Sequence, residues 1–163
     1  MQEFSRRRFL GRSVALAALP LVSPLAACSG TGNDTVTRAG PPLYPNETPE
    51  LRRLINQYAD LYEIPRPLVH RLAIRESTHR PEAINRPYYG LLQILPATAR
   101  SMGFRGEPMD LLDAETNLKY AGKYLRGAWL LSDGSFDTAV KHYSRGYYYE
   151  AKRRGMLEET GVG

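Results

Sequence analysis

Apolar residues between positions 48 and 154 recur at the three- and four-residue spacing of amphipathic helices, and no segment shows the two-residue alternation of a half-buried strand. The clearest stripe consists of Leu51, Leu54, Ile55, Tyr58 and Leu61. The chain has one cysteine, so no internal disulfide can stabilise it. We therefore predict a mainly α domain whose stability depends on a packed helical core.

Capping residues and helix breakers predict where the helices begin and end. Thr48 followed by Pro49 is a typical helix start, Asp113 is a typical N-cap, and Gly103 is a typical stop. Residues 78–89 are expected to form a loop, and residues 132–135 a turn. The expected helices cover residues 49–62, 67–76, 96–102, 114–131, 136–144 and 147–154.

The first 27 residues have the features of an export signal. Residues 5–10, Ser-Arg-Arg-Arg-Phe-Leu, resemble a twin-arginine signal, and the apolar stretch that follows is too short to remain as a membrane-spanning helix. Residues 25–28, Leu-Ala-Ala-Cys, resemble a lipoprotein cleavage box. We predict a signal peptide over residues 1–27 and lipidation of Cys28. Ser29 follows the cysteine in place of an aspartate, which resembles lipoproteins sorted to the outer membrane.

Charge argues against nucleic-acid binding. Residues 1–27 hold four arginines and one glutamate, so their removal lowers the formal net charge from +5 to +2, and no clustered basic face remains. The segment after Cys28 is rich in Gly, Thr, Pro and Asn and poor in apolar residues. We predict a flexible, lipid-anchored tether over residues 28–47 and one domain over residues 48–163, held at a cell-envelope membrane and facing the periplasm.

Glu76 is the candidate catalytic residue. It lies four residues beyond Leu72 and seven beyond Val69, so it continues the apolar stripe of the expected helix over residues 67–76. Partial burial raises the pKa of a carboxyl group and allows it to act as a general acid near neutral pH. By itself, the stripe also fits a solvated glutamate or one paired with Arg71, Arg75 or Arg80.

The residues around Glu76 form four ordered blocks. They are Glu76-Ser77, residues 90–99 (Gly-Leu-Leu-Gln-Ile-Leu-Pro-Ala-Thr-Ala), residues 117–125 (Asn-Leu-Lys-Tyr-Ala-Gly-Lys-Tyr-Leu) and residues 139–146 (Ala-Val-Lys-His-Tyr-Ser-Arg-Gly). These blocks resemble the soluble lytic transglycosylase family, relatives of goose-type lysozyme. The resemblance implies a small lysozyme-like helical domain with a substrate cleft, in which Glu76 cleaves the glycan strands of peptidoglycan without a cofactor.

The same resemblance assigns supporting roles, each with a structural alternative. Ser77 is expected to orient the acid or the substrate, or to cap a helix. Gly90 is expected at the cleft floor, or in a simple turn, and Gln93 at a sugar hydroxyl, or bonded internally. Tyr143 is expected to face the catalytic carboxyl, or to fill the core. Asn117 is expected among the substrate-binding residues, or as a structural residue that links the long helix to the cleft loops. Tyr89, like Tyr88, is expected to stack on a sugar or to pack internally.

The sequence departs from the family pattern in the cleft. The loop between Glu76 and Gln93 is one residue shorter than usual, Leu92 replaces a methionine, and Ser144 replaces an asparagine. These departures concern the shape of the substrate subsites. They leave the acid in place.

No second catalytic carboxylate and no metal site are expected. Asp113 is better explained as a helix cap and Glu82 as a loop residue, with Asp110 the remaining neighbour. The three histidines are widely spaced in the sequence, at positions 70, 79 and 142, which argues against a metal triad.

Three functions remain open from the sequence. The first is a lytic transglycosylase that forms 1,6-anhydro-N-acetylmuramic acid, with Glu76 acting as acid and then as base. The second is a lysozyme-like hydrolase on the same scaffold, with water as the nucleophile. The third is a non-catalytic lipoprotein that binds glycan at the envelope.

Overall fold

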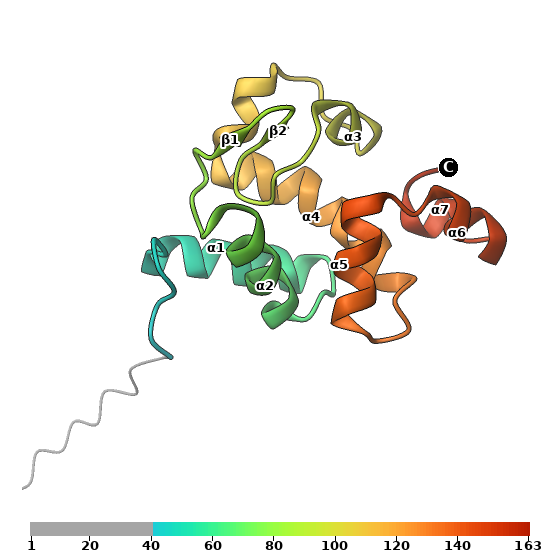
Figure 1. The fold of residues 1–163 in the computed structure, drawn as a ribbon, viewed down its shortest axis with the longest axis horizontal. Coiled ribbons are helices and arrows are strands. Elements are labelled where there is room, and N and C mark those ends of the chain that lie inside the picture. The colour runs from blue at the N-terminus through green and yellow to red at the C-terminus, as the bar shows by residue number, and fades with distance from the viewer. Residues whose placement is uncertain (1–40) are drawn as a thin grey trace, which may run out of the picture. The chain divides into compact units, whose positions relative to one another are not determined.

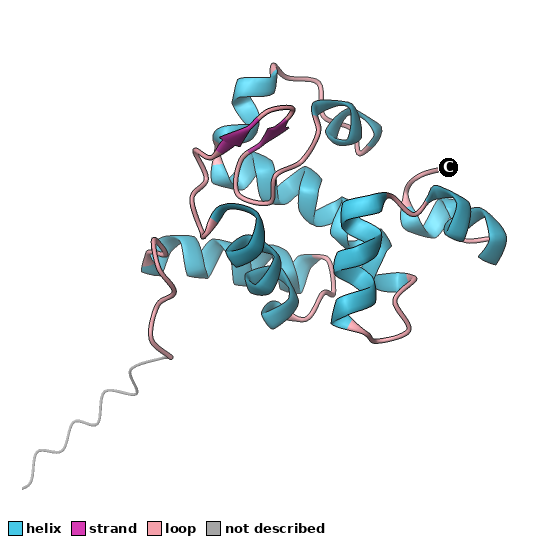
Figure 2. Cartoon of the chain, in the orientation of Figure 1, coloured by secondary structure: helices cyan, strands magenta, loops and turns pink. Residues whose placement is uncertain are grey.

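The computed structural model describes residues 41–163, and the predicted signal peptide, Cys28 and most of the predicted tether lie outside the described residues. The elements, in chain order, are α1 (Pro49–Leu61), α2 (Arg66–Ser77), β1 (Ile84–Asn85), β2 (Tyr88–Tyr89), α3 (Pro96–Ser101), the 3-10 helix η1 (Pro108–Leu112), α4 (Ala114–Leu130), α5 (Phe136–Arg145), α6 (Tyr148–Arg154) and α7 (Leu157–Thr160) (Figure 1). The prediction of a mainly α domain is confirmed (Figure 2).

The long helix α4 forms the centre of the domain. Leu118, Ala121 and Leu125 lie on its buried face, and the helix packs against α1, α3, α5 and α7. Asp113 caps it as expected, because the carboxylate accepts a hydrogen bond from the backbone N–H of Thr116 at 2.8 Å. The helix therefore supplies a rigid support for the loops above it.

The helix α2 carries the candidate acid near its C-terminal end. Leu68, Val69, Leu72 and Ala73 are buried along one stripe, as their spacing predicts. The chain leaves the helix through two left-handed residues, Thr78 with φ 54° and His79 with φ 56°. This abrupt turn sends the chain into the loop that faces Glu76.

Residues 78–89 contain a feature that the sequence analysis missed. Ile84 pairs with Tyr89 and Asn85 with Tyr88 in a small antiparallel hairpin, and the Arg86–Pro87 peptide bond is cis. Each strand has only two residues, too few for an alternating pattern to reveal it. The hairpin lies next to the Glu76 pocket and so shapes it.

The folded domain begins before residue 48. Residues 44–47, expected in the tether, pack against the domain, since Glu47 is buried and forms an ion pair with Arg52 on α1 at 2.5 Å. The side chain of Asn46 also donates a hydrogen bond to the carbonyl oxygen of Thr78. Within residues 41–163, no helix is both long enough and apolar enough to cross a bilayer.

Candidate active site

Glu76 is the penultimate residue of α2 and lines a pocket of about 290 Å³. Its side chain keeps 23% of its surface exposed, so it is shielded and still accessible to a ligand. The lining residues come from α2, the hairpin, the following loop and α5, and they are Arg75, Glu76, Asn85, Tyr88, Gln93, Tyr143 and Ser144. Glu76 is the one carboxylate in this lining.

The electrostatics of the pocket favour a protonated Glu76. Burial raises the pKa of the Glu76 carboxyl, because desolvation disfavours the anion. The guanidinium of Arg75, with Nε 3.5 Å from Glu76 Oε1, opposes this and lowers the pKa by a smaller amount. The net rise matches the expectation from the apolar stripe and gives the side chain the property that a general acid needs.

The other acidic candidates lie elsewhere. Asp113 caps α4, and the carboxylate of Asp110 accepts a hydrogen bond from the backbone N–H of Glu107 at the start of η1. Glu82 is exposed and lines a different hollow. In the described part of the chain, therefore, no second carboxylate reaches the pocket with Glu76.

Tyr143 is buried on α5 and lines the pocket. Its hydroxyl donates a hydrogen bond to the carbonyl oxygen of Leu92 at 2.8 Å, so its hydrogen is not directed at Glu76. Burial raises the pKa of Tyr143, and a negative charge on Glu76, which lines the same pocket, raises it further. The phenol thus stays neutral beside the acid and holds the Leu92 loop.

Ser77 and Asn117 hold the loop at the floor of the pocket. The Ser77 hydroxyl donates to the carbonyl oxygen of Leu91 at 2.7 Å and lies outside the pocket lining. Asn117 is fully buried, donates to the carbonyl oxygens of Tyr89 and Leu111, and accepts from the N–H of Leu92. Both side chains use their hydrogen bonds internally, which favours their structural alternatives over substrate contact.

Gln93 reaches the pocket with its amide already engaged. Its Nε2 donates to the carbonyl oxygens of Ala83 at 3.0 Å and Gly90 at 2.8 Å, and its Oε1 accepts from Nδ2 of Asn85. An amide nitrogen has two hydrogens, so neither remains for a sugar. The structure therefore supports the internal role, and only Oε1 can accept one further hydrogen bond.

Asn85 and Tyr88 line the pocket, whereas the sequence placed Tyr89 among the substrate-binding residues and gave no signal for Asn85. Tyr88 is 42% exposed at the pocket, whereas Tyr89 packs against the hydrophobic core. The tyrosine placed to stack on a sugar is thus Tyr88, and Tyr89 takes the packing alternative. The two-residue strand explains the split, since neighbouring residues on a strand point to opposite faces.

A second pocket of about 200 Å³ continues the first. It shares Tyr88, Gln93, Tyr143 and Ser144 with the Glu76 pocket. It extends along the loop before α3, past Thr98 on α3 and Tyr124 on α4, to the end of α5. The two adjoining pockets form one groove, and Glu76 lies in the first of them. A larger hollow of about 850 Å³ along α1 shares no residue with this groove.

The histidines are not all dispersed. The rings of His70 and His79 lie side by side, with His70 Nδ1 3.2 Å from His79 Nε2, and buried Glu47 lies next to them. The expectation from sequence spacing is wrong for this pair, because the turn after α2 brings His79 back to the helix. None of the three residues lines the groove.

A mainly helical domain with one shielded carboxylate in an open groove is consistent with the lysozyme-like class of folds. The profile of the transglycosylase SLT domain family matches residues 53–153, so the chain belongs to this family. Members of the family are lytic transglycosylases, lyases that act on the glycan strands of peptidoglycan. No curated protein and no solved structure matches the chain.

The pocket gives one prediction for pH dependence. A general acid must be protonated, so activity should fall as pH rises through the pKa of Glu76. Arg75→Gln removes the positive charge that lowers this pKa. We expect the alkaline limb of the kcat/KM profile on purified peptidoglycan to move to higher pH.

The matched control for this prediction is Arg71→Gln. Arg71 lies on the same helix, is exposed, and pairs with Asp137 rather than with Glu76. The alkaline limb of the kcat/KM profile of Arg71→Gln should stay at the wild-type position. A limb that is unmoved or moves to lower pH in Arg75→Gln would contradict the assignment of Glu76 as the titrating acid.

Proposed function

We propose that this protein is a membrane-anchored lytic transglycosylase that cleaves the β-1,4 bond between N-acetylmuramic acid and N-acetylglucosamine and forms 1,6-anhydro-N-acetylmuramic acid. The observation that carries the proposal is Glu76, the one carboxylate in its pocket, with a pKa raised by burial. Hydrolases that pair two carboxylates need a second acid to act as nucleophile or to activate water. A reaction with an internal nucleophile needs one residue only.

In the first step, protonated Glu76 donates its proton to the bridging oxygen, and the bond from C1 of the muramic residue to that oxygen breaks. The N-acetylglucosamine fragment leaves with a new hydroxyl group. The substrate's acetamido carbonyl oxygen is expected to stabilise the positive charge that develops at C1. Glu76 is now a carboxylate.

In the second step, the 6-hydroxyl oxygen of the same muramic residue attacks C1, and ionised Glu76 takes the hydroxyl proton. This restores the protonated acid, and no water is consumed. The step requires a carboxyl whose pKa lies above the ordinary carboxyl range, and burial raises the pKa of Glu76 in this direction.

The groove supports binding of a glycan strand. The two adjoining pockets offer room on either side of their shared residues, and the exposed ring of Tyr88 presents a flat apolar surface of the kind on which sugars stack. Asn85 adds an amide whose Oδ1 has no intramolecular partner in the described part of the chain, while its Nδ2 holds Gln93. We infer that these two residues, together with Gln93 Oε1, contact the saccharide.

Product analysis tests the reaction and distinguishes it from hydrolysis. Digestion of purified peptidoglycan should give muropeptides with 1,6-anhydro ends, which are lighter by one water than the reducing ends left by a hydrolase. Mass spectrometry of the digest measures this difference directly. A digest that contains only reducing ends would replace the transglycosylase assignment with that of a lysozyme-like hydrolase.

We propose that the enzyme is exported by the twin-arginine route and anchored through lipidated Cys28, so that it faces the periplasm, at the outer membrane. The support is the sequence of residues 5–10 and 25–28. Cys28→Ser should move the protein from the membrane fraction to the soluble periplasmic fraction, and replacing Arg6 and Arg7 with lysine should block export. Unchanged fractionation of both variants would refute this localisation.

A further inference from the structure

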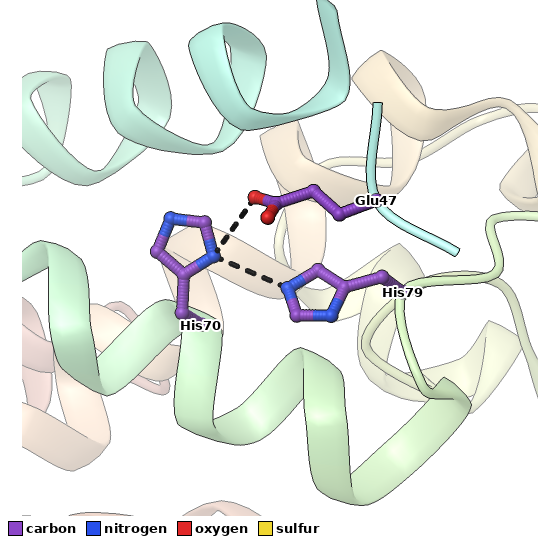
Figure 3. Close-up of side chains that lie close together, drawn as sticks. All are labelled: Glu47, His70 and His79. Atoms are coloured by element: carbon purple, nitrogen blue, oxygen red, sulfur yellow. Dashed lines mark hydrogen bonds and ion pairs between the residues drawn. The ribbon is translucent and has the colours of Figure 1, made fainter. Parts of the chain in front are cut away.

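A buried cluster of nitrogen and oxygen ligands lies outside the groove. We propose that Glu47, His70 and His79 form a binding site for one divalent transition-metal ion, with zinc as the preferred ion. The three side chains come from the segment before α1, from α2 and from the turn after α2, and they converge on a common point (Figure 3). The proposal is independent of the reaction at Glu76.

Two of the three ligand separations are close to those of a tetrahedral site. His70 Nδ1 lies 3.2 Å from His79 Nε2 and 3.5 Å from Glu47 Oε1, and the three ligand atoms all lie within 4.8 Å of one another. Zinc bonds of roughly 2.0–2.1 Å at a tetrahedral angle place ligand atoms roughly 3.3–3.4 Å apart. The two short separations bracket this value. A water molecule would complete the four ligands.

The tautomer of His70 is the one that binds a metal. Its Nε2 lies 3.2 Å from Oδ1 of Asn56, and an amide oxygen can only accept, so Nε2 carries the hydrogen. Nδ1 therefore has a lone pair and faces His79 and Glu47. A second ring nitrogen held by a neighbouring acceptor is the usual arrangement of a metal-binding histidine.

Glu47 has one acceptor position left, and it faces His70. Its Oε2 accepts from Nη2 of Arg52 and from the backbone N–H of Tyr44, and its Oε1 accepts from Nε of Arg52. A carboxylate has about four lone-pair sites, so the remaining one is on Oε1, the oxygen 3.5 Å from His70 Nδ1. Arg52 thus holds the carboxylate in place and leaves one position open.

The surroundings favour the neutral form of both rings, which is the form that binds metals. Burial lowers the pKa of His70 and of His79, the charge of Arg52 lowers both further, and the charge of Glu47 opposes the change. In the empty site the lone pair of His70 Nδ1 holds a proton on His79 Nε2, 3.2 Å away, while His79 Nδ1 is buried without a hydrogen-bond partner in the described part of the chain. A cation would bind the lone pair of His79 Nε2 after this proton moves to Nδ1.

A simple hydrogen bond between the rings explains less of the geometry. One proton shared by His79 Nε2 and His70 Nδ1 satisfies two atoms and leaves the free lone pair of Glu47 Oε1 directed at the same point. A cation satisfies all three. It would also join the segment before α1 to the turn at the end of α2, three residues beyond Glu76, where Thr78 and His79 both have left-handed backbones.

The test uses the full chain with Cys28→Ser, because this change removes the one thiol that could compete for zinc. We expect one zinc per chain by elemental analysis, and a thermal midpoint that rises when zinc is added to chelator-treated protein. His79→Gln should abolish the stoichiometric zinc and the rise. Asn56→Ala should weaken zinc binding by roughly 10- to 100-fold, as expected for loss of a partner that orients a ligand.

The matched control is His142→Gln, since His142 lies on α5 outside the cluster and should leave zinc binding unchanged. Equal zinc binding by His79→Gln and His142→Gln would overturn the proposal, as would the absence of bound zinc in the folded parent protein. Should His79→Gln fail to fold, the visible spectrum of the Co²⁺-loaded parent protein decides. A tetrahedral spectrum supports the site, and an octahedral spectrum or none overturns it.

Discussion

Glu76→Gln should lower the rate of peptidoglycan cleavage by roughly 10²- to 10⁴-fold, the usual contribution of a general acid. The amide has nearly the same shape as the carboxyl but cannot give up a proton, and in the described part of the chain no second carboxylate lines the pocket to replace it. Release of soluble muropeptides from purified sacculi, followed over time, measures the effect. If neither the wild type nor the variant releases muropeptides, the result would contradict an enzymatic role and favour glycan binding alone.

Stability separates this loss from misfolding. The pKa of Glu76 is raised in the folded state, so the ionised side chain favours unfolding as pH rises from the ordinary carboxyl range through the folded-state value. Removing that charge should therefore not lower the thermal midpoint at neutral pH. Glu82→Gln is the matched control, because Glu82 is a nearby exposed carboxylate outside the pocket, and it should retain wild-type activity.

Gly90→Ala should destabilise the domain by about 4 kcal/mol or more, which is an exceptional effect for one methyl group. Gly90 has φ +81°, and a Cβ there would lie 2.1 Å from the carbonyl oxygen of Leu111 and 2.2 Å from Nδ2 of Asn117. Neither neighbour can move easily, since one is backbone and the other is a buried amide that fixes three backbone groups. Urea unfolding followed by circular dichroism measures the loss.

Gly134→Ala is the matched control for the clash. Gly134 has the same φ of +81°, but a Cβ there would meet nothing within 4 Å. In this variant the free energy of unfolding should fall only by the cost of placing alanine in a left-handed backbone, roughly 1–2 kcal/mol. Equal losses at both positions would mean that backbone conformation, rather than contact with Leu111 and Asn117, requires glycine at position 90.

The helices could be predicted from the sequence because their signals are local. Thr48 and Asp113 cap α1 and α4 as expected, each by accepting a hydrogen bond from a backbone N–H three residues later. The short elements could not be predicted in the same way. The hairpin has two residues in each strand, and α7 spans only Leu157–Thr160, so neither is long enough to show a period.

The candidate site was predictable in part. The position of Glu76 at the end of an apolar stripe indicated partial burial, and the pocket and the raised pKa agree with that expectation. The sequence could not show how the polar side chains around it are engaged. Gln93 and Ser77 satisfy backbone groups far from them along the chain, and Tyr88 rather than Tyr89 reaches the pocket.

The sequence alone determined the helical class of the domain, because helix periodicity and capping depend on residues a few positions apart. Its resemblance to the transglycosylase family pointed to the candidate acid. Only the tertiary structure decided which polar groups remain available to a ligand, because hydrogen bonds and burial depend on segments brought together by folding. The pair formed by His70 and His79 shows this most directly. They are nine positions apart in the chain, and a left-handed turn after α2 places their ring nitrogens 3.2 Å apart beside Glu47.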